Sequence, residues 1–353
     1  MTSLSPVSRK HEGEIRRLQV TGGSTYILSL PKKWITKNQL KKGSLLLITE
    51  EEDGSLAVSS QPTSTREQRS GEALIKVSSN DNPNTMVRKV VSAYLVGYNM
   101  IRVKIHDHQQ MTSRQRNTVK DFARRLLVGT EIVTDTPAEL ILQVLLSYPE
   151  LSIQSALRRM CIITSSMHRD ALTALKDHDL QLAKSVIATD DEVDRFNLYV
   201  VRQLKTAIQN PRIIKEIGLK NARDCLGYRQ VTKSVERAAD HAASIAENVL
   251  LLKKPIDEET FKNLEEMSNL AVSLFETAIE SLFRLDFNLA ESVIQKTKDV
   301  SFPMKEALLA SKKIGTEEVA NLRLVIESLR RTAEYASDIA EIVLNLTVES
   351  VVG

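Results

Sequence analysis

The sequence predicts a multidomain protein with a small N-terminal β domain, a middle α+β domain and a C-terminal all-α region of two three-helix bundles. The segment SVERAADHAASIAENVLLL, which begins at Ser234, is matched 94 positions later by SLRRTAEYASDIAEIVLNL, which begins at Ser328. A second block, LAKSVI from Leu182, recurs as LAESVI from Leu289. Two matched blocks in the same order indicate an internal duplication. The third observation is a Gly-Gly pair between two strand-like segments near the N-terminus, which is typical of a tight hairpin.

The composition is that of a folded protein with more than one core. A chain of 353 residues is too long to fold around one ordinary hydrophobic core. The aromatic content of 4% favours helices packed through Leu, Val, Ile and Ala. The chain has only two cysteines, Cys161 and Cys225, which are too few for a disulfide framework or a thiolate zinc site. The sequence has neither a signal peptide nor an apolar run of the roughly 20 residues that cross a bilayer. We therefore expect a cytoplasmic protein without membrane insertion.

Charge is distributed unevenly along the chain. The segment Arg9–Lys42 carries nine Lys and Arg residues against two Glu residues, whereas Ile256–Gly353 carries ten against eighteen Asp and Glu residues. This division predicts a basic N-terminal end for an anionic partner and an acidic C-terminal end with another task.

The N-terminal domain, residues 1–60, is predicted to contain two hairpins. Strand-like segments at Ile15–Val20 and Ser24–Leu30 flank the Gly22-Gly23 pair, and a short helical turn follows Pro31. The second hairpin joins SLLLI and SLAVS, which start at residues 44 and 55. About 50 residues in such short strands scarcely close a core alone, so we expect a dimer.

These residues resemble the AbrB/SpoVT family of swapped-hairpin DNA-binding domains. The resemblance rests on the hairpin, on Leu30-Pro31-Lys32 with Trp34, and on Leu40 and Gly43 before the last strands. It implies that two chains interleave and that basic loops meet DNA, with contact residues Arg16, Arg17, Lys32, Lys33 and Lys37. Phosphate contacts of this kind weaken steeply with salt. The alternative is that the domain serves only to dimerise.

A polar linker, residues 61–71, leads to the middle domain, residues 72–148. Its predicted order is βαβαββ, which indicates a small open sheet with helices on one face. Asn82-Pro83 opens the first helix, and Thr112 with Gln115 forms a capping-box start for the second. The domain lacks a nucleotide-binding fingerprint, and we expect a scaffold or dimerising role.

The two helical copies are predicted at residues 150–254 and 256–348. In the first copy we expect three long helices: one that ends near Lys176, one that contains the block at Leu182, and one that contains the segment from Ser234. A shorter helix is expected over residues 213–226. In the second copy, the helices are expected at Glu258–Phe283, Phe287–Ala310 and Glu317–Leu346.

Four carboxylates are candidates for a cation site in the first copy. Asp190 and Asp194 are four residues apart on one helix, and Glu236 and Asp240 are four apart on the next. Two charges about 4 Å apart near a protein surface repel by roughly 4 kcal/mol. If the four carboxylates meet, either Arg195 and Arg237 neutralise them or a hard cation does, and oxygen ligands suit magnesium, manganese, calcium or iron. The alternative is a solvated acidic face.

The phrases DDEVDRFNLYVVRQL and VERAADHAASIAENV resemble the signature helices of the PhoU family of phosphate-uptake regulators, in its archaeal form with an AbrB-like domain. The resemblance implies duplicated three-helix bundles and a metal ion, with iron, zinc, magnesium and manganese as candidates, held by Asp190, Asp194, Glu236 and Asp240. The second copy departs from the pattern, because Arg330 stands at the position equivalent to Glu236 and Thr297 at the position equivalent to Asp190. A metal site is therefore not expected in the second copy.

Two functions follow from these features. The first is a DNA-binding transcriptional regulator of phosphate uptake and homeostasis, with a metal-binding sensory bundle and a homodimeric or higher homo-oligomeric state. The second is a signalling adaptor that docks on a phosphate transporter or a kinase. A metal-dependent hydrolase is disfavoured because the sequence pairs no nucleophile with a base, so we do not expect an enzyme.

Overall fold

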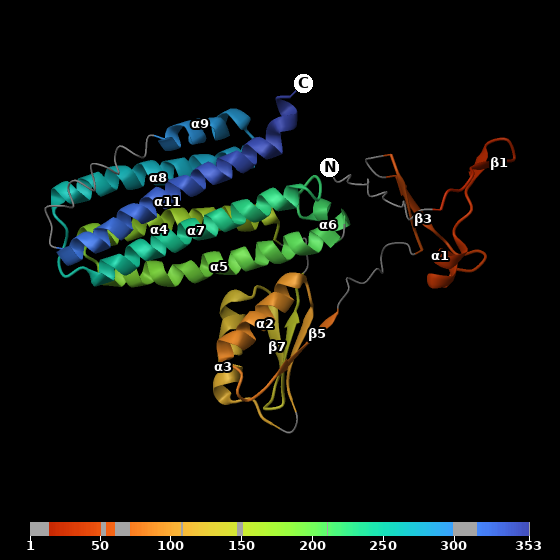
Figure 1. Cartoon of the computed structure of the whole chain (residues 1–353), viewed down its shortest axis with the longest axis horizontal. Helices are drawn as coiled ribbons and strands as arrows, with labels where there is room; N and C mark the ends of the chain where they lie inside the picture. The colour runs from red at the N-terminus through yellow and green to blue at the C-terminus, as the bar shows by residue number, and fades with distance from the viewer. Residues whose placement is uncertain are drawn as a thin grey trace, which may run out of the picture. The chain divides into compact units, whose positions relative to one another are not determined.

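The computed structural model describes residues 14–50, 54–60, 71–106, 109–146, 151–209, 211–298 and 316–352. It separates into two compact units, residues 1–69 and residues 70–353 (Figure 1). Among the described residues, every helix is either too short or too polar to cross a bilayer.

The first unit contains the two predicted hairpins, with shorter strands than expected. β1 (Gln19–Thr21) pairs with β2 (Thr25–Ile27), and β3 (Leu47–Glu50) pairs with β4 (Leu56–Ser59), both antiparallel. Gly22 and Gly23 have φ angles of 61° and 84°, which the tight turn requires and which side chains disfavour. α1 (Lys32–Lys37) follows β2.

The described part of this first unit has no buried residue. Large apolar side chains are left in water, including Ile15, Leu18, Val20, Tyr26, Leu45, Ile48 and Leu56. One copy of the unit therefore lacks a closed core of its own.

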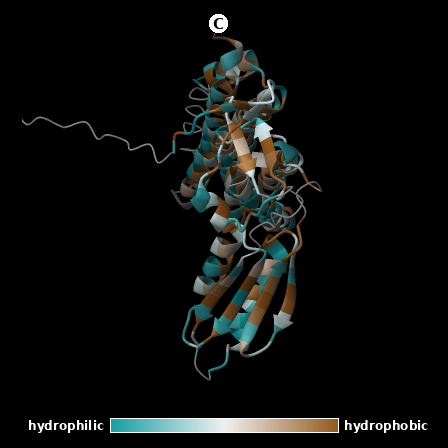
Figure 2. Cartoon of the chain, turned by 90° about the vertical axis from the view of Figure 1, so that its right-hand side faces the viewer, coloured by the Kyte–Doolittle hydropathy of each residue, from teal (hydrophilic) through white to brown (hydrophobic). Residues whose placement is uncertain are grey.

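The middle domain has the predicted element order, and Figure 1 shows its two helices beside the sheet. Its strands are β5 (Glu72–Val77), β6 (Met100–Ile105), β7 (Thr130–Asp135) and β8 (Glu139–Val144). They lie in the order β5-β6-β8-β7, with β5 and β6 parallel and the other pairs antiparallel. Figure 2 shows apolar and polar residues interspersed along these strands, as expected of a sheet with one covered face.

The helices α2 (Pro83–Val96) and α3 (Ser113–Leu126) begin where the sequence predicts. Thr112 and Gln115 form the capping box reciprocally. The Gln115 side chain also donates to the backbone carbonyls of Ser78, Ser79 and Asp81, which fixes the loop between β5 and α2.

The helical region contains long helices at the predicted places. The first copy has α4 (Ile153–Asp177), α5 (Leu180–Gln209) and α7 (Asp224–Leu251), and the second has α8 (Glu258–Arg284), α9 (Phe287–Thr297) and α11 (Thr316–Thr347). The end predicted for the middle helix of the second copy, at Ala310, lies outside the described residues. α11 ends in a single 3-10 turn, Val348–Ser350.

The prediction of one short helix over residues 213–226 is wrong. α6 (Pro211–Glu216) ends before Gly218, whose φ of 84° terminates it. α7 begins at Asp224, well before the predicted Ser234. The Asn221 side chain accepts the backbone N–H groups of Arg223 and Asp224, at 2.8 and 3.1 Å, and this cap allows the earlier start.

Contacts between equivalent residues trace a local twofold axis. Arg169 and Glu276, which are 107 positions apart like the two LAxSVI blocks, form an ion pair of 2.5 Å. His241 and Tyr335, 94 positions apart like the two signature helices, stack with ring centroids 5.8 Å apart. Residues related by a twofold axis meet only where the axis passes between them. These pairs lie where the internal duplication predicts that such an axis would pass.

The axis runs through an alanine-rich packing of α7 against α11. In α7, Ala238, Ala239, Ala242 and Ala246 are fully buried, and in α11 so are Ala333, Ala336 and Ala340. Small side chains let helix axes approach closely. His168 of α4 is also fully buried at this crossing, with its Nε2 atom 2.9 Å from the Ala238 carbonyl oxygen and 3.2 Å from Thr332 Oγ1.

Arg202 of α5 joins the middle domain to the helical body. Its buried guanidinium donates to the backbone carbonyls of Tyr94, Gly97 and Tyr98 and, at 2.7 Å, to Asn99 Oδ1. These carbonyls lie at the C-terminal end of α2, where the helix dipole favours a positive charge. A Cβ at Gly97, whose φ is 108°, would lie 3.1 Å from Thr206 Oγ1, so the end of α2 sits tightly against α5.

We predict that Arg202→Met lowers the free energy of unfolding of the second unit by about 2–4 kcal/mol, because the carbonyls at the end of α2 lose a charged donor inside the protein. Urea unfolding followed by circular dichroism measures the change. Arg195→Met, on an exposed position of the same helix, should change stability by less than about 0.5 kcal/mol. Equal losses in the two variants would contradict the anchoring role.

Candidate functional site

α5 and α7 bring the four predicted carboxylates together. The four-residue spacing places Asp190 and Asp194 on one face of α5, and Glu236 and Asp240 on one face of α7. Burial and then the charges of Asp240, Asp194 and Glu236 raise the pKa of Asp190 to about 7. The charges on α7 therefore act on an α5 side chain, and α5 and α7 pack against each other.

The other two aspartates show the same effect. Burial, followed by the charges of Glu236 and Asp191, raises the pKa of Asp194 to about 6. Burial, followed by the charge of Glu236, raises the pKa of Asp240 to about 6. In addition, the Asp190 Oδ1 atom is buried without a hydrogen-bond partner among the described residues. The cluster thus holds more negative charge than its neighbours compensate.

Two positive charges at the edge of this cluster differ from the predicted ones. Lys233 pairs with Glu236, one helical turn away on α7. This pair could have been predicted from the sequence, because residues three apart on a helix are neighbours. Arg125 of α3 pairs with Asp191, with its Nε atom 3.1 Å from Oδ2, and it also lowers the pKa of Asp194. No sequence signal links Arg125 to the cluster, because the two belong to separate domains.

Of the two arginines that the sequence offered as neutralisers, one lies at the cluster. The Arg237 charge lowers the pKa of Asp240, against the larger effects of burial and of Glu236. Arg195 is exposed, and its charge acts on the Tyr94 phenol of the middle domain.

The donor chemistry of the cluster fits a hard cation. All four side chains offer carboxylate oxygens, which magnesium, manganese and iron accept. As they stand, no three His, Cys, Asp or Glu side chains in the described part of the chain converge closely enough to hold a metal ion. Binding would therefore require these carboxylates to rotate towards one point, and the unpartnered Asp190 oxygen is available for it.

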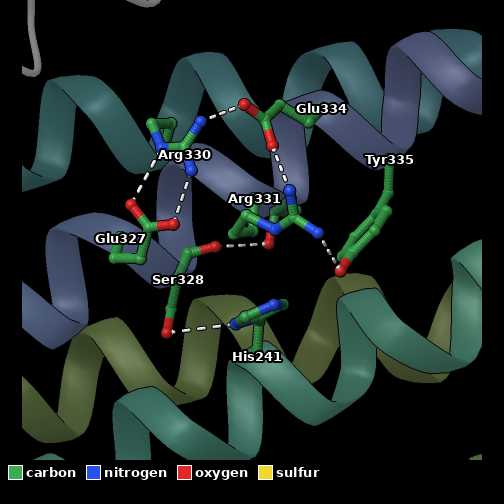
Figure 3. A network of polar contacts seen from close by, with 8 residues as sticks. His241, Glu327, Ser328, Arg330, Arg331, Glu334 and Tyr335 are labelled. Carbon is green, nitrogen blue, oxygen red and sulfur yellow. Dashed lines mark hydrogen bonds and ion pairs between the residues drawn. The ribbon is translucent and has the colours of Figure 1, made fainter.

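The equivalent face of the second copy compensates its own charges. Arg330, which answers Glu236, donates to Glu327 at 2.8 Å and pairs with Glu334 (Figure 3). Arg331 pairs with Glu334 at 2.7 Å and donates to the Tyr335 hydroxyl at 3.0 Å. Glu334 thus forms ion pairs with both arginines.

His241 lies between α7 and α11, as Figure 3 shows, with its Nδ1 atom 3.2 Å from Ser328 Oγ. Its contacts to Ser328 and to the Tyr335 ring are with the second copy.

The candidate DNA-contacting residues Arg16, Arg17, Lys32, Lys33 and Lys37 are all exposed. Arg16 pairs with Glu14, and the three lysines lie on α1. Trp34, between them, is half-buried, as are Ile35 and Leu40.

Comparisons with known proteins match both parts of the chain. The family profile of the PhoU domain matches residues 157–249 and 264–343. A second profile, "Antidote-toxin recognition MazE, bacterial antitoxin", matches residues 19–67, where the swapped-hairpin domain was predicted.

The similar relatives carry one description. "Phosphate-specific transport system accessory protein PhoU homolog" of Borreliella burgdorferi is 26% identical over 49% of this chain and 81% of that protein. Homolog 1 of Thermotoga maritima is 24% identical over 54% of this chain and 84% of its own length. Among solved structures, PhoU from Pseudomonas aeruginosa aligns with a TM-score of 0.48 and 24% identity, over 56% of this chain and 96% of that one.

We predict that Asp190→Asn stabilises the metal-free protein, and more at pH 7.5 than at pH 5. The unfolded chain loses the Asp190 proton near pH 4, whereas the native state holds it to about pH 7, so this group lowers the free energy of unfolding as pH rises through that window. After screening by solvent and by the opposing charges of Lys233, Arg125 and Arg237, the gain at pH 7.5 should be about 1–2 kcal/mol.

Urea unfolding in the presence of a chelator measures this gain at both pH values. His168, whose pKa burial lowers to about 4, contributes the opposite slope, so the difference between variant and wild type is the quantity to compare. Glu192→Gln, on an exposed position of α5, should keep the wild-type slope. A gain from Asp190→Asn that is equal at pH 5 and pH 7.5 would contradict the raised pKa.

Proposed function

Because residues 157–249 and 264–343 belong to the PhoU domain family, we propose that the chain is a cytoplasmic regulator of phosphate transport and homeostasis. The observation that carries the proposal is the pair of PhoU domains, related by the local twofold axis through Arg169 and Glu276. The relatives that share this region are described as accessory proteins of phosphate-specific transport. In this proposal the helical body senses phosphate status and the N-terminal unit passes the signal to DNA.

The DNA-binding part of the proposal rests on the first unit. Its basic side chains are exposed, and three of them are gathered on α1. Its apolar side chains lack a core within one chain, so a second copy would cover them and would bring a second basic set alongside the first. A homodimer, or a higher homo-oligomer, with doubled basic surface suits the phosphate backbone of DNA.

The sensing part of the proposal rests on the carboxylates of α5 and α7. Asp190, Asp194, Glu236 and Asp240 would hold one or more metal ions, with iron, zinc, magnesium and manganese as candidates. A bound cation would supply the positive charge that this cluster lacks. The side chains themselves would then tie α5 to α7, because the repulsion that raises their pKa values would be relieved.

The second candidate function is a signalling adaptor that docks on a phosphate transporter or a kinase, with the N-terminal unit only dimerising. The acidic second copy and the transport descriptions of the relatives favour it. The two candidates differ in whether the basic residues of α1 contact DNA.

We expect Lys32→Glu with Lys33→Glu to weaken binding to the promoter region of the protein's own gene and to reduce its salt dependence. If each lysine contacts one phosphate, charge neutralisation alone lowers the slope of log affinity against log salt by about two for each bound chain. Gel-shift titrations at several salt concentrations measure this slope. Lys41→Glu with Lys42→Glu makes the same charge change outside the proposed contacts and should weaken binding less. Unchanged affinity in the first variant would support the adaptor function.

Asp194→Ala with Asp240→Ala should remove the metal from the purified protein, since each helix loses one of its two carboxylates. Elemental analysis of the purified full chain measures metal content per chain. Glu334→Ala with Asp338→Ala makes the corresponding change on α11 and should leave the metal content as in wild type. Equal metal content in wild type and the first variant would eliminate the proposed site.

A further inference from the structure

A hollow of about 510 Å³ opens between α4 of the first copy and α8 of the second. It lies apart from the carboxylates of α5 and α7, and its volume is that of small-molecule sites. Its walls combine arginines, aromatic rings and two glutamates: Arg158, Cys161, Ile162, Ser165, Arg169, Phe275, Glu276, Ile279, Glu280, Phe283 and Arg284.

The charges around this hollow leave one positive side chain uncompensated. Arg169 pairs with Glu276, and Arg284 pairs with Glu280, each at 2.5 Å. Arg158 forms no ion pair with any residue that the structure describes, and its guanidinium carbon lies 4.1 Å from the centre of the Phe283 ring. The hollow therefore presents a cation held over an aromatic face, with a net charge that favours an anion.

The floor of the hollow is apolar with one available hydroxyl group. Phe275 and Ile279 are 1% and 7% exposed, and burial raises the pKa of the Cys161 thiol, as expected of a surface of low polarity. Ser165 is 4% exposed and lines the hollow, and its hydroxyl makes no hydrogen bond within the described part of the chain. The Ser165 hydroxyl is therefore open to a ligand or to water from the hollow.

We propose that this hollow binds a small organic anion with an apolar body. The anionic group, a carboxylate, sulfonate or phosphate, would pair with Arg158, and an acceptor atom of the ligand would take the Ser165 hydroxyl proton. The apolar body would lie on Phe275, Ile279 and Phe283. Because α4 and α8 belong to different copies, the ligand would bridge the two PhoU domains close to their local axis.

The aromatic anion 8-anilinonaphthalene-1-sulfonate tests the proposal on the full chain, by fluorescence titration. Ile162 is 64% exposed at the edge of the hollow, so Ile162→Trp should fold normally and fill the space. The fluorescence component that Ile162→Trp removes is the signal of the hollow, as distinct from dye on the exposed apolar side chains of the first unit. We expect Arg158→Gln to weaken this component by about five- to tenfold, the loss of one charged contact.

Arg159→Gln is the matched control. Arg159 is the adjacent exposed arginine, and it faces Phe196 of α5 at 6.0 Å instead of the hollow. Its dye affinity should equal that of wild type. Decanoate should displace the dye from the hollow, whereas decyltrimethylammonium, with a like apolar body and a positive head, should not.

Three results would each overturn the proposal: no fluorescence component lost in Ile162→Trp, equal affinity in Arg158→Gln and wild type, or displacement by the cationic competitor as effective as by decanoate. Circular dichroism of each variant shows whether it is folded. Because the dye reports neither on the carboxylates nor on DNA, failure here would leave the regulatory function standing.

Discussion

The close packing of α7 against α11 is the constraint on which the helical body depends. The alanines of both helices let the two copies share one core, and only side chains of that size fit at their crossing. This crossing sets the local axis, and the axis in turn sets which faces of α5 and α7 meet and how α4 lies beside α8. His168 fills the crossing from α4, and its contacts to Ala238 and Thr332, themselves equivalent residues, hold the two copies in register.

The two copies have kept their backbone arrangement and diverged in charge. In the first copy, α5 and α7 carry four carboxylates, and burial together with their mutual repulsion raises the pKa values of Asp190, Asp194 and Asp240. In the second, Arg330 and Arg331 take up Glu327 and Glu334 within the same helix (Figure 3). The two copies therefore differ in how they compensate the acidic side chains of these helices. The middle domain contacts the first copy through Arg125, which pairs with Asp191, and through the C-terminal end of α2, which Arg202 binds.

The sequence was sufficient for most of the element order and for the two matched helical copies, because each leaves a periodic or repeated pattern along the chain. It was insufficient wherever a feature joins separate segments. Arg125 and Arg202 are ordinary helix-surface arginines in sequence, and only tertiary packing gives them Asp191 and the end of α2 as partners. The hollow beside Arg158 could not be predicted for the same reason, since the α4 and α8 residues that line it are more than 100 positions apart in sequence. The early start of α7 was missed because Asn221 caps it locally while apolar periodicity marks only the segment from Ser234 onwards.

The ion pair of Arg169 with Glu276 has a consequence for the symmetry of the molecule. Two identical single-copy subunits placed around the same axis would oppose arginine to arginine, or glutamate to glutamate, at this point, and either arrangement would be repulsive. Two covalently joined copies that differ in sequence can place opposite charges there. Two identical copies of either half, arranged in the same way, would therefore lack this ion pair.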